Sequence, residues 1–261
     1  MTDCPLVLRT DVEGVTTLTL NRPESRNALS GAMLHALNQA LIVIAADTAV
    51  RVVVLAGAGP VFCAGHDLKE LRAAATETAT VEALFATCAE VMQRIVMLPK
   101  PVIARVQGMA TAAGCQLVAS CDLAIAAEDA HFATPGVTIG LFCSTPMVAL
   151  SRAIGPKQAM RMLLTGEPID AATALQFGLV SDLAPPADLE AQCEALARLL
   201  ASKSPLTLAI GKGAFQRQRE MGLAEAYAYT SGLMARNLAS ADAQEGIAAF
   251  LEKRSPVWCG R

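Results

Sequence analysis

Strand patterns alternate with helical patterns through the first two-thirds of this chain, and the last third carries helical patterns alone. Residues 15–20 alternate at period two and residues 52–56 form a β-branched apolar run, so both are predicted as strands. A helix between them follows Ser30, a good capping residue, and repeats apolar side chains every three or four positions. This alternation predicts repeated β-β-α units around a core rich in parallel strands.

The same order continues further along the chain. A second helix is predicted over 81–98, followed by a strand at 102–106, a short helix at 115–120 and a strand at 122–126. After Pro185 the patterns predict helices at 189–200, 206–215, 223–238 and 241–253. We therefore expect a core over residues 1–186 and a C-terminal helical region over 187–261 that is not an independent domain.

Composition limits the classes of function and location. Hydrophobic residues make up 53% of the 261 positions and charged residues 17%, a balance that favours a subunit interface and hence an oligomer. With a net charge of −3 and no Lys/Arg-rich stripe, nucleic-acid binding is not expected. No signal-peptide pattern or membrane-spanning run is present, so we expect a cytoplasmic protein without membrane partners.

The eight cysteines are scattered and show no CxxC pair. Several lie inside apolar runs, which is typical of small buried side chains in a reducing compartment. We expect neither a disulfide framework nor a metal site.

Two short segments combine glycine and alanine at a strand-to-helix turn. FCAGHDLKEL, over 62–71, places His66 just before a helix that begins near Asp67, and TAAGCQL, over 111–117, places Ala113 at another helix start. Backbone N–H groups at such turns point outward, and two that converge on one carbonyl oxygen form an oxyanion hole. Close packing of a helix on a sheet requires the same small residues, so composition alone leaves both interpretations open.

Six segments in order make the chain resemble the enoyl-CoA hydratase/isomerase, or crotonase, superfamily over about residues 18–258. They are LNRPESRNAL, FCAGHDLKE, KPVIARVQGMATAAGCQLVASCD, AHFATPGVTIGL, AMRMLLTGEPIDAATALQFGLV and FLEKRSPVW. The resemblance implies an α/β superhelix of β-β-α units with a C-terminal helical trimerisation region. It also implies homotrimers or hexamers that bind an acyl-CoA thioester as substrate, with no separate cofactor.

Carried over by position, the resemblance assigns the oxyanion N–H groups to His66 and Ala113. The residues that it places along the CoA path are Arg26, Ala28, Asp67, Leu68, Lys69 and Gly114, and it implies that Lys253 or Arg254 of the C-terminal tail meets a CoA phosphate, on the same or a neighbouring subunit. Lys69 is open to a second interpretation as an ordinary surface side chain, and the His66 ring is either turned aside or able to reach the substrate.

The chain departs from the family at its two catalytic carboxylates. The hydratases carry glutamates where this sequence has Gln116 and Gly136, and neither residue accepts a proton near neutral pH. Because each acid–base group contributes roughly 10² to 10⁴ in rate, we expect weak hydratase activity, raised by restoring both glutamates. Decarboxylation or expulsion of a leaving group, and acyl-CoA binding without catalysis, stay open as alternatives.

The loop over 140–146 brings further polar groups near the same place. We expect Cys143 to line the pocket rather than act as a nucleophile, since no basic neighbour is evident in the sequence. Ser144 is predicted to cap a helix over 147–154. Asp122 is predicted to be a structural hydrogen-bonding residue.

Overall fold

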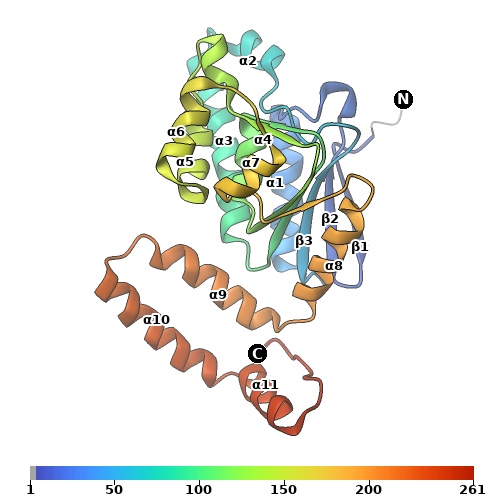
Figure 1. Ribbon diagram of the computed structural model, residues 1–261, viewed down its shortest axis with the longest axis vertical. Helices are drawn as coiled ribbons and strands as arrows, with labels where there is room; N and C mark the ends of the chain where they lie inside the picture. Colours follow the sequence, from blue (N-terminus) through green and yellow to red (C-terminus); the bar gives the residue numbers. More distant parts are fainter. Residues whose placement is uncertain (1–3) are drawn as a thin grey trace.

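The computed structural model describes residues 4–261 and contains a six-stranded sheet whose order is β1-β2-β3-β4-β6-β9 (Figure 1). Its strands are β1 Val7–Val12, β2 Val15–Leu20, β3 Val52–Gly57, β4 Val102–Val106, β6 Leu123–Ala127 and β9 Asp182–Ala184. All neighbouring pairs are parallel except β1 and β2. The central strand β3 is buried at its first five positions, which agrees with its continuous apolar sequence.

A second sheet, of three strands, contains the second strand of the β-β-α units that begin with β4 and β6. It consists of β5 Met109–Thr111, β7 His131–Ala133 and β8 Ile169–Asp170. Strand β4 of the first sheet is followed directly by β5 of the second, and β6 is followed by β7, before the chain turns into helices. These two units each contribute one strand to each sheet, and the α/β superhelix predicted from the sequence is confirmed.

Helices connect these strands along the chain. They are α1 Gly31–Ala46, α2 Leu68–Ala74, α3 Thr78–Met97, α4 Ala113–Ser120, α5 Ser144–Ala153, α6 Pro156–Thr165 and α7 Ala171–Phe177, with short 3₁₀ helices η1 Pro23–Ser25 and η2 Pro135–Ile139. As predicted, Ser30 caps α1, because its side chain accepts a hydrogen bond from the N–H of Met33 at 3.2 Å. The apolar stripe of α1 is buried in the core and packs beside α3.

The region 187–261 divides into a helix on the sheet and a projecting arm. Helix α8, Leu189–Ala201, packs against β3, β4 and β6. Helices α9 Pro205–Gln218, α10 Leu223–Leu238 and α11 Ala241–Glu252 extend away from the rest of the chain (Figure 1). No residue of α10 is buried. Within residues 4–261, no helix is both long and apolar enough to cross a membrane.

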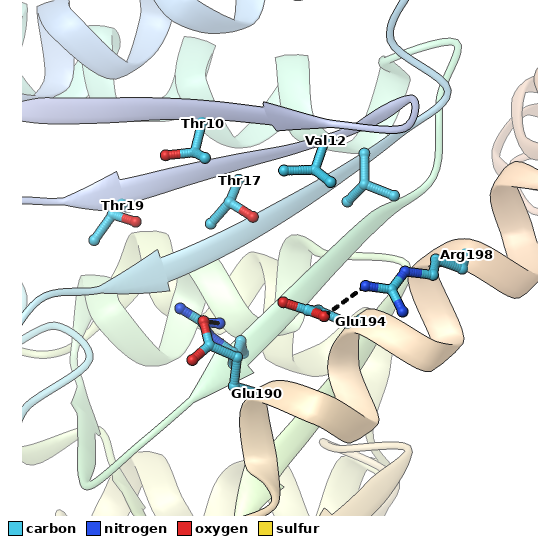
Figure 2. A pocket seen from close by; sticks show the side chains of 9 residues that line it. Thr10, Val12, Thr17, Thr19, Glu190, Glu194 and Arg198 are labelled. Carbon is cyan, nitrogen blue, oxygen red and sulfur yellow. Dashed lines mark hydrogen bonds and ion pairs between the residues drawn. The ribbon is translucent and has the colours of Figure 1, made fainter.

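Between α8 and the outer strands β1 and β2 lies a small polar hollow (Figure 2). Threonines of the sheet face the carboxylates of α8 there, and Glu194 accepts a hydrogen bond from Arg198 at 2.8 Å. Arg105 pairs in the same way with Glu190. These charges neutralise one another inside the chain, so we assign no ligand to this hollow.

One ion pair, with Lys212 largely buried and Asp122 partly exposed, ties the base of the arm to the core. The Lys212 ammonium of α9 donates to the carbonyls of Ile95 and Lys100 at 2.9 and 3.0 Å, and to Asp122 Oδ2 at 2.6 Å. Asp122 also accepts from the N–H of Val102 at 2.7 Å, so its predicted structural role is confirmed. Burial raises the pKa of Asp122 and lowers that of Lys212, which means that each charge depends on the other for compensation.

Replacement of Lys212 by Met is expected to lower the free energy of unfolding by about 1–3 kcal/mol, because the Asp122 carboxylate, whose side chain is 22% exposed, loses the charge that compensates its partial burial. Urea denaturation followed by circular dichroism measures the change. Lys157→Met, at an exposed lysine of α6, is the matched control and should alter stability by less than about 0.5 kcal/mol. A loss as small as that of the control would show that the pair does not stabilise the arm.

Candidate functional site

A cavity of 470 Å³ lies where α2, α3, the start of α4, η2 and α5 meet. Its wall is largely apolar, with a few hydroxyl, thiol and imidazole groups. The lining residues are Ala64, His66, Leu68, Leu71, Phe85, Ala112, Ala113, Pro135, Gly136, Thr138, Ile139, Leu141, Phe142, Cys143, Ser144, Thr145 and Pro146. An apolar cavity with a few convergent polar groups is the usual form of a small-molecule site.

The two glycine and alanine turns predicted from the sequence meet at this cavity. Gly65 has a φ of +84°, and a Cβ atom there would lie 2.9 Å from the Thr111 carbonyl oxygen and 3.2 Å from the Ala113 nitrogen. Only glycine permits so close an approach in that backbone conformation. His66 follows in the chain, so its backbone is held beside the first residue of α4.

Both turns leave a backbone donor free. Asp67 caps α2 by accepting a hydrogen bond from the N–H of Lys69 at 3.0 Å. His66 lies one residue before this cap, so its N–H is not used by the helix. Ala113 is the first residue of α4, where N–H groups lack helical partners. Neither N–H donates a hydrogen bond to any acceptor among residues 4–261, while both residues line the cavity.

Ala112 holds the second turn in a strained backbone conformation. Its φ of +50° and ψ of −116° lie where residues other than glycine are rarely found. Such conformations cost on the order of 1–3 kcal/mol and tend to persist at functional sites. The N–H of Ala112 donates to the Ala133 carbonyl at 2.9 Å, which ties this turn to β7.

Gln116 and Gly136 occupy different surroundings in the structure. Gln116 is buried, does not line the cavity, and its Oε1 has no hydrogen-bond partner within residues 4–261. Gly136 does line the cavity, but a Cβ atom there would lie 2.2 Å from the Leu141 carbonyl oxygen. The expectation that two glutamates could be restored by substitution therefore meets an obstacle at position 136, because the backbone of Leu141 would have to move.

The remaining predicted site residues fall into two groups. Leu68, Cys143 and Ser144 line the cavity beside His66 and Ala113. Those outside its wall are Arg26, Ala28, Asp67, Lys69, Gly114 and Lys253. Arg26 and Lys69 are exposed and Ala28 and Gly114 are buried. Lys253 ends α11 in the arm, at the opposite end of the molecule from α2 (Figure 1).

Ser144 begins its helix rather than capping it. Helix α5 starts at Ser144 with Cys143 in the cap position, and the Ser144 hydroxyl lies 3.4 Å from the Phe142 carbonyl oxygen. The prediction of a cap before a helix at 147 is wrong, because Pro146 is tolerated within the first turn and does not delay the helix. Cys143 lines the cavity as predicted, and burial raises the pKa of its thiol.

Phe85 and Leu71 also line the cavity, although the sequence did not mark them as site residues. Phe85 belongs to the apolar stripe of α3, and such a stripe does not distinguish a side chain facing the core from one facing a cavity. Within residues 4–261, no three His, Cys, Asp or Glu side chains gather as a metal site would need.

Comparison with known proteins identifies the family. The family model for enoyl-CoA hydratase/isomerase matches residues 10–261. The chain belongs to the enoyl-CoA hydratase/isomerase family. Within this family it groups with the enoyl-CoA hydratase domain-containing proteins, and it is 49% identical to human "Enoyl-CoA hydratase domain-containing protein 3, mitochondrial" over 247 residues, which are 95% of this chain and 81% of that one.

Two solved structures of family members are closely similar to this one. A Mycobacterium smegmatis structure described as an enoyl-CoA hydratase superposes with a TM-score of 0.94 at 52% identity, covering 97% of this chain and 99% of that one. The structure of human enoyl-CoA hydratase domain-containing protein 3 gives a TM-score of 0.94 at 47% identity, with coverage of 97% and 100%. The family resemblance inferred from the six sequence segments is thus confirmed.

Replacement of Gly136 by Ala is expected to lower the free energy of unfolding by about 1–3 kcal/mol, because even one methyl group overlaps the Leu141 carbonyl oxygen. Urea denaturation provides the measurement. Gly213→Ala is the control, since a Cβ atom at Gly213 meets no atom within 4 Å, and in a helix it should be neutral or stabilising by up to about 1 kcal/mol. Equal stability of the two variants would contradict the predicted overlap.

Proposed function

We propose that the cavity binds the acyl group of a CoA thioester and that the N–H groups of His66 and Ala113 donate hydrogen bonds to the thioester oxygen. The observation that carries the proposal is the pair of unpartnered backbone donors, held side by side by Gly65 at the wall of an apolar cavity. Such donors stabilise the negative charge of an enolate oxygen without having to reorganise. Membership of the enoyl-CoA hydratase/isomerase family supports the choice of ligand.

The wall of the cavity favours enolate chemistry over hydration. Among the described residues that line it there is no Asp or Glu, so no carboxylate is present to deliver water to the β-carbon. Reactions that need only the enolate, such as loss of a carboxylate or a leaving group from the substrate, remain compatible with this wall. The lack of an Asp or Glu among these lining residues also favours a second candidate function, acyl-CoA binding without catalytic activity.

The CoA moiety carries phosphates that need cations outside the cavity. Lys69 follows the His66 turn, is exposed and forms no ion pair with residues 4–261, so it is a suitable contact for a phosphate or the adenine. Lys253 is likewise exposed and makes none, whereas Arg254 is held by Glu245 and Glu252. Of these two residues we choose Lys253 as the contact for a CoA phosphate, and we expect that CoA to be bound by a neighbouring subunit.

The arm supports assembly into homotrimers or hexamers. Helices α10 and α11 expose large apolar side chains, among them Leu223 at 77% and Phe250 at 83% exposure. Exposed apolar surface of this extent is typical of a face that another subunit covers. A second copy of the chain is the partner that the excess of apolar residues in the sequence favours.

The cytoplasmic location expected from the sequence stays a prediction. The human relative carries the word mitochondrial in its name, and that name describes the human protein.

The proposed ligand and the weak hydratase activity can be tested together. Calorimetry is expected to detect binding of crotonyl-CoA and malonyl-CoA, while crotonyl-CoA hydration, followed by loss of the enoyl absorbance, should fall at least about 10²-fold below that of a hydratase with both glutamates. Binding without any product from enoyl-, malonyl- or hydroxyacyl-CoA would support the non-catalytic binder. Failure to bind every CoA ester would refute both candidates.

Replacement of Tyr227 and Phe250 by Asp is expected to convert the assembly into monomers, since both side chains are exposed on the arm and charges resist burial in an interface. Sedimentation velocity measures the mass, which should be three or six chains for the unaltered protein. Val43→Asp, at an exposed apolar position of α1, is the control and should leave the mass unchanged. A monomeric unaltered protein would rule out the proposed assembly.

A further inference from the structure

Asn27 is a buried polar residue in the segment LNRPESRNAL, over 20–29. Its exposure is 0%, and its backbone has a φ of +53°, as has that of Arg26 before it. Asparagine enters this left-handed region more readily than most residues other than glycine. A buried amide needs hydrogen-bond partners inside the protein, so its contacts show which part of the structure it holds.

The Asn27 side chain holds the loop that follows β3 and leads into the first turn of the site. Its Nδ2 donates to the carbonyls of Ala58, Val61 and Phe62 at 2.9, 2.8 and 3.1 Å. Its Oδ1 accepts from the N–H of Arg22 at 2.9 Å. Three carbonyls of one loop therefore converge on a single amide, an arrangement that a hydroxyl, with one donor, or an ionised carboxylate, with none, does not satisfy.

Leu29, two residues after Asn27, pairs with the turn itself. Its N–H donates to the Gly65 carbonyl at 2.8 Å and its carbonyl accepts from the N–H of Asp67 at 3.3 Å, which makes a parallel bridge between Leu29 and His66. In such a bridge the residue between the two bonded neighbours directs its own N–H to the opposite side. The N–H of His66 is therefore turned away from Leu29, and within residues 4–261 it has no acceptor.

Cys63 connects Asn27 with the second turn. Its thiol donates to the Asn27 carbonyl at 3.3 Å, and its N–H donates to the Met109 carbonyl at 3.2 Å. Its own carbonyl accepts from the N–H of Thr111 at 2.9 Å, two residues before Ala113. The loop that Asn27 holds continues directly into Cys63, so a shift of that loop changes the spacing between the two backbone donors of the site.

We infer that Asn27 is the positioning residue for the N–H groups of His66 and Ala113. Its side chain fixes the 58–62 loop, and the loop in turn fixes the backbone from which the His66 N–H projects. Asn27 does not line the cavity, so it acts on a bound thioester only through these donors. The inference rests on the proposed function, in which both N–H groups donate to the thioester oxygen.

Two substitutions test the inference. Asn27→Gly removes the amide and keeps a residue that adopts positive φ without strain, while Asn27→Asp keeps the shape and the acceptor but removes the N–H donors. In both variants the 58–62 loop loses its hydrogen bonds to the side chain, and either variant alone is sufficient if the other does not fold. Each should still bind butyryl-CoA in calorimetry, with a dissociation constant raised by no more than about tenfold, the equivalent of about 1.4 kcal/mol and the upper end of what one hydrogen bond contributes.

The infrared band of the thioester carbonyl provides a direct readout of the two donors. In butyryl-CoA that is isotopically labelled at this carbon, the band moves to lower wavenumber when the oxygen accepts hydrogen bonds, because these weaken the C=O bond. Binding to the unaltered protein should shift the band in this direction relative to free butyryl-CoA. In both Asn27 variants most of the shift should be lost, because the two donors no longer converge on one oxygen.

Two control variants separate positioning from a loss of stability. Asn38→Asp makes the same exchange at another buried asparagine, whose Oδ1 accepts from Arg94 Nε at 2.7 Å. Lys212→Met removes the ion pair at the base of the arm and changes no residue of either turn. Both controls should keep the shifted band.

The outcomes distinguish this inference from the proposed function. A full shift in folded Asn27→Gly or Asn27→Asp, or an equal loss of the shift in Lys212→Met, would overturn the role of Asn27 and leave the proposed function standing. Butyryl-CoA that binds to the unaltered protein without any shift would refute the two donors and, with them, the inference. If the unaltered protein binds no CoA ester, the proposed function fails together with the inference.

Discussion

The close approach of Gly65 to the start of α4 is the constraint on which the site depends. Two turns from different β-β-α units meet there with no room for a side chain between them. The sheet order brings the units together, and Asp67 and Ala112 then fix the direction of each turn, one by capping α2 and the other by a strained backbone. As a result, two backbone N–H groups are held in place by the fold rather than by flexible side chains, which is the arrangement that electrostatic stabilisation requires.

The site combines this backbone geometry with side chains that include no carboxylate at position 116 or 136. The backbone donors depend on glycine, alanine and the helix starts, all of which are present. The proton-transferring groups depend on single side chains, and here Gln116 is buried beside the site while Gly136 contributes backbone alone. Under the proposed function, binding and chemistry are therefore carried by separate parts of the structure: backbone donors hold the thioester, and single side chains transfer protons.

The sequence predicted the features that follow from local patterns and from motif order. The strands, the buried stripe of α1, the helix starts at Asp67 and Ala113 and the structural role of Asp122 all depend on nearby residues or on recognisable segments. It did not predict that the Gln116 side chain lies outside the cavity wall, that α5 starts at Ser144, or that α8 packs on the sheet while the later helices project. These depend on contacts between residues far apart in the chain, which periodicity does not encode.

The Leu141 carbonyl over Gly136 has a consequence for how this lineage can change. A glycine codon of the GGA or GGG type becomes a glutamate codon by a single base change, so at an unobstructed position such a change supplies a carboxylate in one step. Here the Leu141 N–H donates to the Gly136 carbonyl at 2.9 Å, and the Leu141 carbonyl oxygen fills the space that a Cβ atom at position 136 would need. A side chain at position 136 therefore requires the backbone of Leu141 to shift, so a single codon change there costs loop stability before it can supply a carboxylate to the cavity.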